Sequence, residues 1–338
     1  MLGLIARADN SGLGVQTWEL FRHLQPAKTL VIDVSHLHDK SEHCNKSTHL
    51  DRFPGAMVHQ GWKPGAGTID AFLDGLDTVL TCETPYNPAL FTQARNRGIR
   101  TVLQYNYEFL DTNQPHPDVY AAPSMWRFDD APTNKVHLPV PIATDRFAPR
   151  TPRDHATDFV HIVGRPAIHD RNGTNDLLAA LKFVHSDITV TIKTQDQQFS
   201  PSLAGIPDNV TVRIDRTNVR DYWDNYLTGD VLIMPRRFGG LCLPVNEALG
   251  AGMPVIMPDV SPNNLWLPTE WLVESGWCAA FQAKQRIDIY SANHHALAAK
   301  IDQFTDSGFY VAAHAKAVDL AKRLSWDELL PEYQRVLS

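Results

Sequence analysis

The sequence predicts an α/β protein with two Rossmann-like, doubly wound domains that face each other across a cleft. Short apolar segments of strand character alternate with helical periodicity along most of the 338 residues, the pattern of parallel βαβ units. That length suits two domains of ordinary size. A proline- and arginine-bearing segment, residues 136–153, separates the halves. We therefore expect an N-terminal domain over residues 1–150, a second domain over 151–310, and C-terminal helices over 311–338.

The first half supplies the elements of one parallel sheet. Strands are expected at residues 2–6, 29–34, 78–82, 101–105 and 119–122, the last closing the sheet, and helices at 15–24, 68–75 and 88–97. Residues 35–63 hold five histidines at irregular spacing, and we expect an exposed excursion with little regular structure rather than a metal site. Ligands of such sheets gather at the carboxyl ends of the strands. Glu83, Tyr107 and Glu108 follow two of these ends and are candidate ligand contacts, although turn residues occupy the same places.

The second half predicts another sheet of the same kind. Strands are expected at residues 159–163, 188–193, 210–214, 231–234 and 254–257, and helices at 175–184, 292–304, 308–324 and 326–337, with a short helix around Glu247. Pro235 ends the fourth of these strands, and the Gly239-Gly240 turn leads into the short helix. A strand, a bare-backbone turn and a helix N-terminus form an anion site, because unpaired amides and the helix dipole face the ligand.

The chemistry of this stretch points to a nucleotide. The main-chain amides of the turn can bind phosphate, and they belong to Gly239, Gly240, Leu241 and Cys242. Glu247 stands one or two turns into the helix, where its carboxylate can accept hydrogen bonds from a ribose diol. A phosphate site beside a diol acceptor is what a nucleotide needs. We expect the chain to be organised around this pocket.

The stretch PRRFGGLCLPVNEALGAGMPVIMP resembles the donor-binding signature of GT-B glycosyltransferases, in particular glycosyltransferase family 4. That signature reads roughly E-G-F-G-L-P-x-x-E-A-x-A-x-G-x-P-V-I. Nine positions agree in register: Gly240, Leu243, Pro244, Glu247, Ala248, Gly252, Pro254, Val255 and Ile256. One departure matters for the chemistry. The first glutamate of the family, which holds hydroxyl groups of the donor sugar, falls on Gly239.

The resemblance extends to a strand-to-helix turn near residue 170. Gly164-Arg165, followed by Arg171 and Gly173, is similar to the family's G-R-x(n)-K-G segment, with Arg171 in place of lysine. Two cations beside such a turn neutralise a diphosphate, and arginine grips it with a fork of donors. The alternative is two surface arginines. With Glu247, these two arginines are the predicted catalytic residues.

Other positions follow from the same resemblance. Gly12 and Gly14 stand where the family places a glycine-rich loop against the donor phosphates, although a tight βα turn explains them equally. Thr217 and Asn218 lie where the family borders the nucleobase. Ser325-Trp326, with Tyr333 beyond, is similar to a terminal motif whose last helix braces the first domain.

The family implies a retaining glycosyltransferase that uses a nucleotide-sugar donor. The donor's own phosphate oxygen would take the proton of the acceptor hydroxyl, so no protein base is required. We expect a UDP-sugar in preference to a GDP-sugar, no tightly bound cofactor and no metal, because the sequence shows no cluster of acidic ligands. Glu83, Tyr107 and Glu108 become candidate acceptor contacts.

The acceptor prediction leans toward 5-hydroxymethylcytosine in viral DNA, since the first domain resembles virus-encoded GT-B enzymes that glycosylate such bases. The formal net charge of −7 argues against it. Polysaccharide, lipid and small-molecule acceptors stay open. So do a GT-B sugar-nucleotide epimerase and a binding-only relic. A dinucleotide-dependent dehydrogenase is disfavoured, because the Gly12-Leu13-Gly14 turn lacks the third glycine.

The remaining expectations concern the setting of the protein. The N-terminus reads as a buried strand rather than a secretory signal, and no run of 18 apolar residues predicts a membrane span. The four cysteines lie far apart, which favours reduced thiols. We expect a cytoplasmic protein, in the host cytoplasm if virus-encoded, without a membrane partner and existing as a monomer or weak homodimer.

Overall fold

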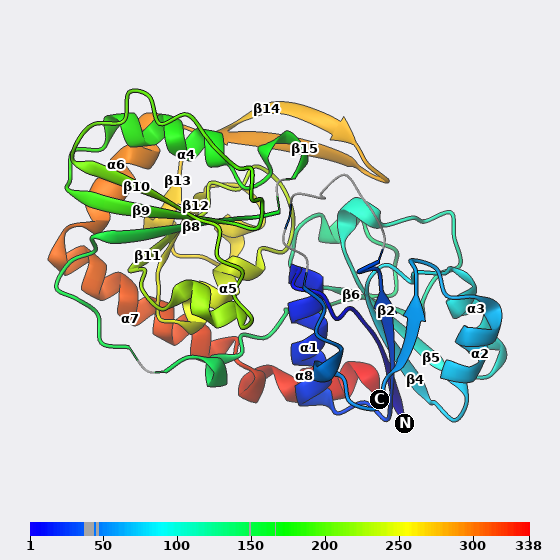
Figure 1. The fold of residues 1–338 in the computed structure, drawn as a ribbon. Helices are drawn as coiled ribbons and strands as arrows, with labels where there is room; N and C mark the ends of the chain where they lie inside the picture. The colour runs from blue at the N-terminus through cyan, green and yellow to red at the C-terminus, as the bar shows by residue number, and fades with distance from the viewer. Residues whose placement is uncertain (37–43, 45–46, 149, 166) are drawn as a thin grey trace.

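The computed structural model describes residues 1–36, 44, 47–148, 150–165 and 167–338 and shows two lobes, each built on a parallel sheet (Figure 1). The N-terminal sheet has the order β3-β2-β1-β4-β5-β6-β7. Its strands are β1 (Leu2–Ala6), β2 (Lys28–Asp33), β3 (Met57–Gln60), β4 (Thr78–Glu83), β5 (Arg100–Tyr105), β6 (Val119–Ala122) and β7 (Lys135–His137). The order reverses between β1 and β4, so the sheet has the switch point where Rossmann-like sheets bind ligands.

The second sheet repeats this plan with the order β10-β9-β8-β11-β12-β13. Its strands are β8 (Asp158–Gly164), β9 (Ile188–Thr194), β10 (Val210–Asp215), β11 (Val231–Ile233), β12 (Val255–Pro258) and β13 (Leu272–Val273). All its neighbouring strands pair in parallel. Its switch point lies between β8 and β11. The predicted class of two doubly wound α/β domains is confirmed.

The helices cover both faces of each sheet. They are α1 (Gly12–Leu24), α2 (Ala66–Leu73), α3 (Ala89–Asn96), α4 (Thr174–Ala180), α5 (Leu243–Gly250), α6 (His294–Phe304), α7 (Ser307–Arg323) and α8 (Trp326–Leu337). Helix α1 begins at Gly12, earlier than the predicted Val15, because Ser11 caps it and its hydroxyl accepts the Gly14 amide at 3.3 Å. No described helix combines the length and apolar character that a bilayer crossing requires.

Separate apolar cores form on the two lobes. Ile192, Leu232 and Ala248 belong to the core of the second sheet, to which α7 also contributes. On one face of the N-terminal sheet, Leu4 and Leu80 pack against Trp326 and Tyr333 of α8. The Tyr333 hydroxyl donates to the Pro139 carbonyl at 3.0 Å. The last helix therefore lies on the first lobe, as Figure 1 shows.

An antiparallel hairpin extends from the second lobe toward the first (Figure 1). It consists of β14 (Ser275–Gln282) and β15 (Arg286–Ala292). Ile287 and Ile289 are buried in the core on the other face of the N-terminal sheet. Lys284 also pairs with Asp111 at 3.0 Å, and Arg127 donates to Asp288 at 2.8 Å. We call β14–β15 the clasp, because it joins the lobes opposite α8.

Several predicted elements are wrong in detail. Residues 119–122 do not close the sheet, since β7 pairs beyond β6. The excursion over residues 35–63 contains β3 and a 3₁₀ turn at Leu50–Arg52, while residues 37–43 and 45–46 lie outside the described chain. The predicted helix at 175–184 ends at Ala180 and continues as a 3₁₀ turn. The clasp is absent from the predictions.

Candidate functional site

A cavity of about 800 Å³ lies between the lobes, at the carboxyl ends of both sheets. The turns that follow β1, β4, β8 and β11 all line it, so it joins the two switch points. The described lining residues include seven cations and two carboxylates. The cations are Arg7, Arg52, Arg165, Arg171, Lys193, Arg220 and Arg236, and the carboxylates are Glu83 and Glu247. The cavity wall is thus cationic in a chain of net charge −7, and it suits an anionic ligand.

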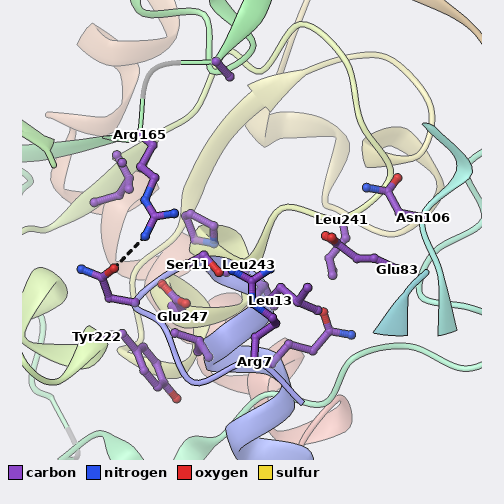
Figure 2. A pocket seen from close by; sticks show the side chains of 18 of the residues that line it. Arg7, Ser11, Leu13, Glu83, Asn106, Arg165, Tyr222, Leu241, Leu243 and Glu247 are labelled. Atoms are coloured by element: carbon purple, nitrogen blue, oxygen red, sulfur yellow. Dashed lines mark hydrogen bonds between the residues drawn. The ribbon is translucent and has the colours of Figure 1, made fainter. Parts of the chain in front are cut away.

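Arg165 reaches across the cavity to the turn before α1. Its Nη2 donates to Asn10 Oδ1 at 2.8 Å, the dashed contact in Figure 2, and its Nε donates to Gln195 at 3.2 Å. Asn10 also donates from Nδ2 to Asn218 at 3.1 Å. This network brings the predicted residues Arg165 and Asn218 together and fixes the guanidinium at the N-terminal end of α1.

Arg171 lies in the same cavity, beside the turn after β11. Its guanidinium forms an ion pair with Glu108 of the first lobe, and its Nε, although buried, has no partner among the described residues. Burial, and then the neighbouring charge of Arg236, lower the pKa of Arg171 to about 10. It therefore stays protonated near neutral pH, with donor capacity available to an anion.

Helix α5 begins at the glycine turn. Gly240 and Leu241 line the cavity, whereas Gly239 and Cys242 are not among its lining residues. Gly239 has φ +116°, and a Cβ there would lie 2.7 Å from Arg236 Nη2 and 2.8 Å from Arg171 Nη2. Two guanidinium groups thus flank the position where the family carries its first glutamate.

Glu247 lies in the cavity one turn into α5 and accepts a hydrogen bond from the Tyr226 hydroxyl. Burial raises the pKa of Glu247 to about 7, the Tyr226 hydrogen bond opposes this rise, and the charge of Glu19 adds to it. The carboxylate is held facing the cleft, beside Leu13 and Tyr222 in Figure 2. Its place agrees with the predicted acceptor of a ribose diol, an assignment that stays a prediction.

The loop after β10 forms another part of the wall. Thr217, Asn218 and Val219 all line the cavity. The Thr217 amide donates to Asp215 at 2.8 Å, and Asn218 donates to the Ser47 hydroxyl at 2.6 Å. These bonds order the loop where the resemblance places the nucleobase.

The predicted glycines have different surroundings. Gly12 lines the cavity, and a Cβ on it would lie 3.3 Å from Leu243 of the opposite lobe. A Cβ on Gly14 would lie 1.9 Å from the Asp9 carbonyl, so Gly14 serves the fold of the turn. Both belong to the first turn of α1 rather than to a loop before it. Gly164 lines the cavity at φ +60° with open space around its Cβ position.

The three candidate acceptor contacts do not form one group. Glu83 lines the cavity at the end of β4. Tyr107 also lines it, and its hydroxyl donates to Asp130 at 3.1 Å. Glu108 is not part of the lining and holds Arg171 instead. Glu108 is therefore a partner of the cation, not a free acceptor contact.

The described chain brings one His-and-carboxylate cluster within metal-binding distance, Glu19, His23 and Asp145. Arg22 pairs with Glu19 at 2.5 Å and with Asp145 at 2.6 Å, and Arg146 pairs with Glu19 at 3.0 Å. Because these cations already neutralise the carboxylates, the cluster is an ion-pair network.

Sequence reasoning missed Asn10, Gln195, Tyr226 and Arg236 at this site. Asn10 and Arg236 could have been predicted, because each lies in a turn that follows a predicted strand, β1 for Asn10 and β11 for Arg236. Gln195 and Tyr226 had none, because their contacts depend on how distant turns meet.

No protein-family model matches the chain, and no curated protein matches it in sequence. Solved structures match it over nearly its whole length. HepE of Anabaena, in complex with UDP and glucose, has a TM-score of 0.68 at 10% identity, covering 99% of this chain and 98% of that one. The sucrose-phosphate synthase of Thermosynechococcus elongatus has a TM-score of 0.63 at 14% identity, covering 99% and 97%. The lipopolysaccharide outer core galactosyltransferase WaaB has a TM-score of 0.62 at 12% identity, covering 99% and 98%.

The fold is GT-B. In this GT-B chain the cavity occupies the cleft between the two Rossmann-like lobes. At such low identities the likeness establishes the fold alone, so the activity has to be argued from the residues of the cleft.

Proposed function

We propose that this GT-B protein is a glycosyltransferase that moves a sugar from a nucleotide-sugar donor to an acceptor hydroxyl. The observation that carries the proposal is the convergence of Arg165, Arg171 and the Gly240–Leu241 turn on one cavity at the carboxyl ends of both sheets. Two guanidinium groups and a glycine turn before a helix suit a diphosphate. The nine-position donor signature and the likeness to HepE, solved with UDP and glucose, support the same assignment.

The transfer breaks the bond between the anomeric carbon and the diphosphate oxygen, and it forms a bond from that carbon to the acceptor oxygen. In the retaining course that the family resemblance implies, both events occur on the same face of the sugar. The acceptor proton passes to the departing phosphate oxygen, so the products are a glycoside and a nucleoside diphosphate. Negative charge grows on the diphosphate, and Arg165, Arg171 and the turn amides stabilise it.

Glu247 is assigned to the ribose and the loop at Thr217–Val219 to the base. We favour UDP over GDP, because HepE was solved with UDP. The transfer as written uses no metal, and unchanged turnover in a chelator is the expected result.

The acceptor enters from the first lobe, where Tyr107 and Trp62 line the cavity. The preference for hydroxymethylated DNA as the acceptor gains no support from the comparisons, since none of these three neighbours is described with DNA. A carbohydrate or small-molecule hydroxyl fits the proposal equally, so transfer should be assayed with acceptors of both kinds and with 5-hydroxymethylcytosine DNA.

Purified protein incubated with UDP-glucose, UDP-galactose, GDP-mannose or ADP-glucose should release nucleoside diphosphate, and more with a suitable acceptor, as followed by mass spectrometry. Arg165→Ala with Arg171→Ala should lower this rate at least about a hundredfold, because charge stabilisation at the leaving group is lost. Arg323→Ala, on the exposed end of α7, is the control and should keep the wild-type rate. Near-normal turnover in the double variant refutes the assignment.

A further inference from the structure

The vacant position at 239 raises the question of what holds the donor sugar. Gly239 has no side chain, and Arg171 and Arg236 occupy the space around its Cβ direction. Sugar hydroxyl groups are commonly bound by a carboxylate, which accepts several hydrogen bonds at once. A donor site without one would hold the sugar weakly. The cavity does contain a second carboxylate besides Glu247, and it comes from the opposite lobe.

That carboxylate is Glu83, and its backbone is strained. It has φ +62°, a left-handed conformation that costs a residue other than glycine about 1–2 kcal/mol. The turn imposes this conformation, because the Thr84 amide donates to the Cys82 carbonyl at 2.8 Å and the Thr81 hydroxyl donates to the Thr84 carbonyl at 2.8 Å. Glycine would fit here without strain.

The side chain of Glu83 is directed into the cleft. In Figure 2 it points toward Leu241 of the glycine turn, from the opposite wall. It makes no hydrogen bond to any described residue. Burial raises the pKa of Glu83, and the strongest opposing effect is the charge of Arg171, which also lies against Gly239. The carboxylate of Glu83 and the vacant position 239 therefore share one neighbour.

We propose that Glu83 supplies, from the first lobe, the carboxylate that position 239 lacks, and that it accepts hydrogen bonds from hydroxyl groups of the donor sugar. This inference rests on the proposed function and moves Glu83 from the acceptor contacts to the donor. The sugar would be bound by both lobes, with the diphosphate on one and the hydroxyl-binding carboxylate on the other. Sugar recognition then requires the closed arrangement of the cleft.

Glu83→Gly tests the proposal, because it removes the carboxylate and relieves the strain at the same time. The variant should unfold at the wild-type temperature or above it. Its affinity for UDP should stay within about twofold of wild type, while its affinity for the sugar nucleotide of the panel that wild type uses best should fall about tenfold or more. Glu83→Gln, which keeps the volume, should lose an intermediate amount.

Gln25→Gly is the matched control. Gln25 also has positive φ, at +47°, but it is the exposed C-cap of α1. Both affinities should be unchanged in this variant.

Three results overturn the inference. If Glu83→Gly binds the sugar nucleotide as wild type does, or loses UDP affinity to the same extent, Glu83 does not bind the sugar. If it keeps sugar-nucleotide affinity and hydrolysis but loses transfer, Glu83 contacts the acceptor. In these cases wild-type turnover leaves the proposed function intact. If wild-type protein binds neither UDP nor any sugar nucleotide, the proposed function itself is wrong.

Discussion

Two guanidinium groups pack against Gly239, and this decides what position 239 can accept. A glutamate there would need a Cβ within 2.8 Å of both Arg171 and Arg236, at a φ of +116° that disfavours side chains. Restoring the family residue is therefore not a simple substitution. The sequence showed that the glutamate is missing, but it did not show that cations fill its surroundings, because Arg171 arrives from a turn 68 positions earlier.

Glu247 should make both the stability of the protein and its affinity for UDP depend on pH. Burial raises its pKa from 4.5 to about 7, so the folded state favours the protonated form. The stabilisation from this proton is complete below about pH 4.5 and is lost as pH rises through about 7. A ribose diol, by contrast, donates to the ionised carboxylate. The contribution of the ribose to UDP affinity should therefore grow as pH rises over the same range.

Glu247→Gln should remove both effects. The ratio of wild-type to variant affinity for UDP, measured by calorimetry, should rise several-fold between about pH 6 and pH 8. Because both proteins bind the same ligand, the ratio cancels the effect that ionisation of UDP itself has on the affinity. The variant should also gain stability relative to wild type at the higher pH, as followed by thermal unfolding. A ratio that stays constant with pH would show that Glu247 does not meet the ribose.

At the scale of elements, the turn from β8 to α4 depends on two glycines in left-handed conformation. Gly173, at φ +72°, would place a Cβ 1.9 Å from the Pro235 carbonyl, whereas Gly164, at φ +60°, would place one in open space. The first position is fixed by close packing of two turns that both line the cavity. The second faces the cavity.

The two alanine variants should therefore differ. Gly164→Ala should cost about 1–2 kcal/mol of unfolding free energy, the cost of the left-handed conformation alone. Gly173→Ala should cost clearly more, because a backbone carbonyl has to move as well. Denaturant unfolding measures both. Equal losses would contradict the packing described for Gly173.

Elements with strong periodicity and clear caps were predictable, and others were not. The span of β1 matches the prediction at Leu2–Ala6, and α8 matches at Trp326–Leu337. Strand β14 contains a glycine and two alanines, and its residues are largely exposed or half-buried, so its sequence lacks the apolar run of a sheet strand. The clasp is stabilised by the first lobe, through Ile287 and Ile289, which local sequence does not reveal.

For the whole molecule, the GT-B architecture places two switch points opposite each other. The first six strands of each sheet have the same order, and the turns at both reversals line one cavity. The clasp and α8 join the lobes, and the cleft itself is bridged by Arg165 with Asn10 and by Arg171 with Glu108. A diphosphate entering the cleft would compete with these two bridging contacts, so donor binding and lobe contacts are linked.

The fold class was predictable, and so was the turn that we propose for the phosphate, because a single stretch carries its strand, turn and helix. The cross-cleft contacts were not, since they join residues more than 60 positions apart. The two proposals differ in the same way. The assignment of the diphosphate rests on residues that the sequence identified, and the assignment of the sugar rests on Glu83, whose role only the assembled cleft suggests.

A crystal structure of the protein with bound UDP tests the central claim most directly. The diphosphate should lie within hydrogen-bonding distance of Arg165, Arg171 and the main-chain amides of Gly240 and Leu241, with the ribose against Glu247. A diphosphate bound elsewhere, or a cleft that stays empty at saturating UDP, would contradict the account.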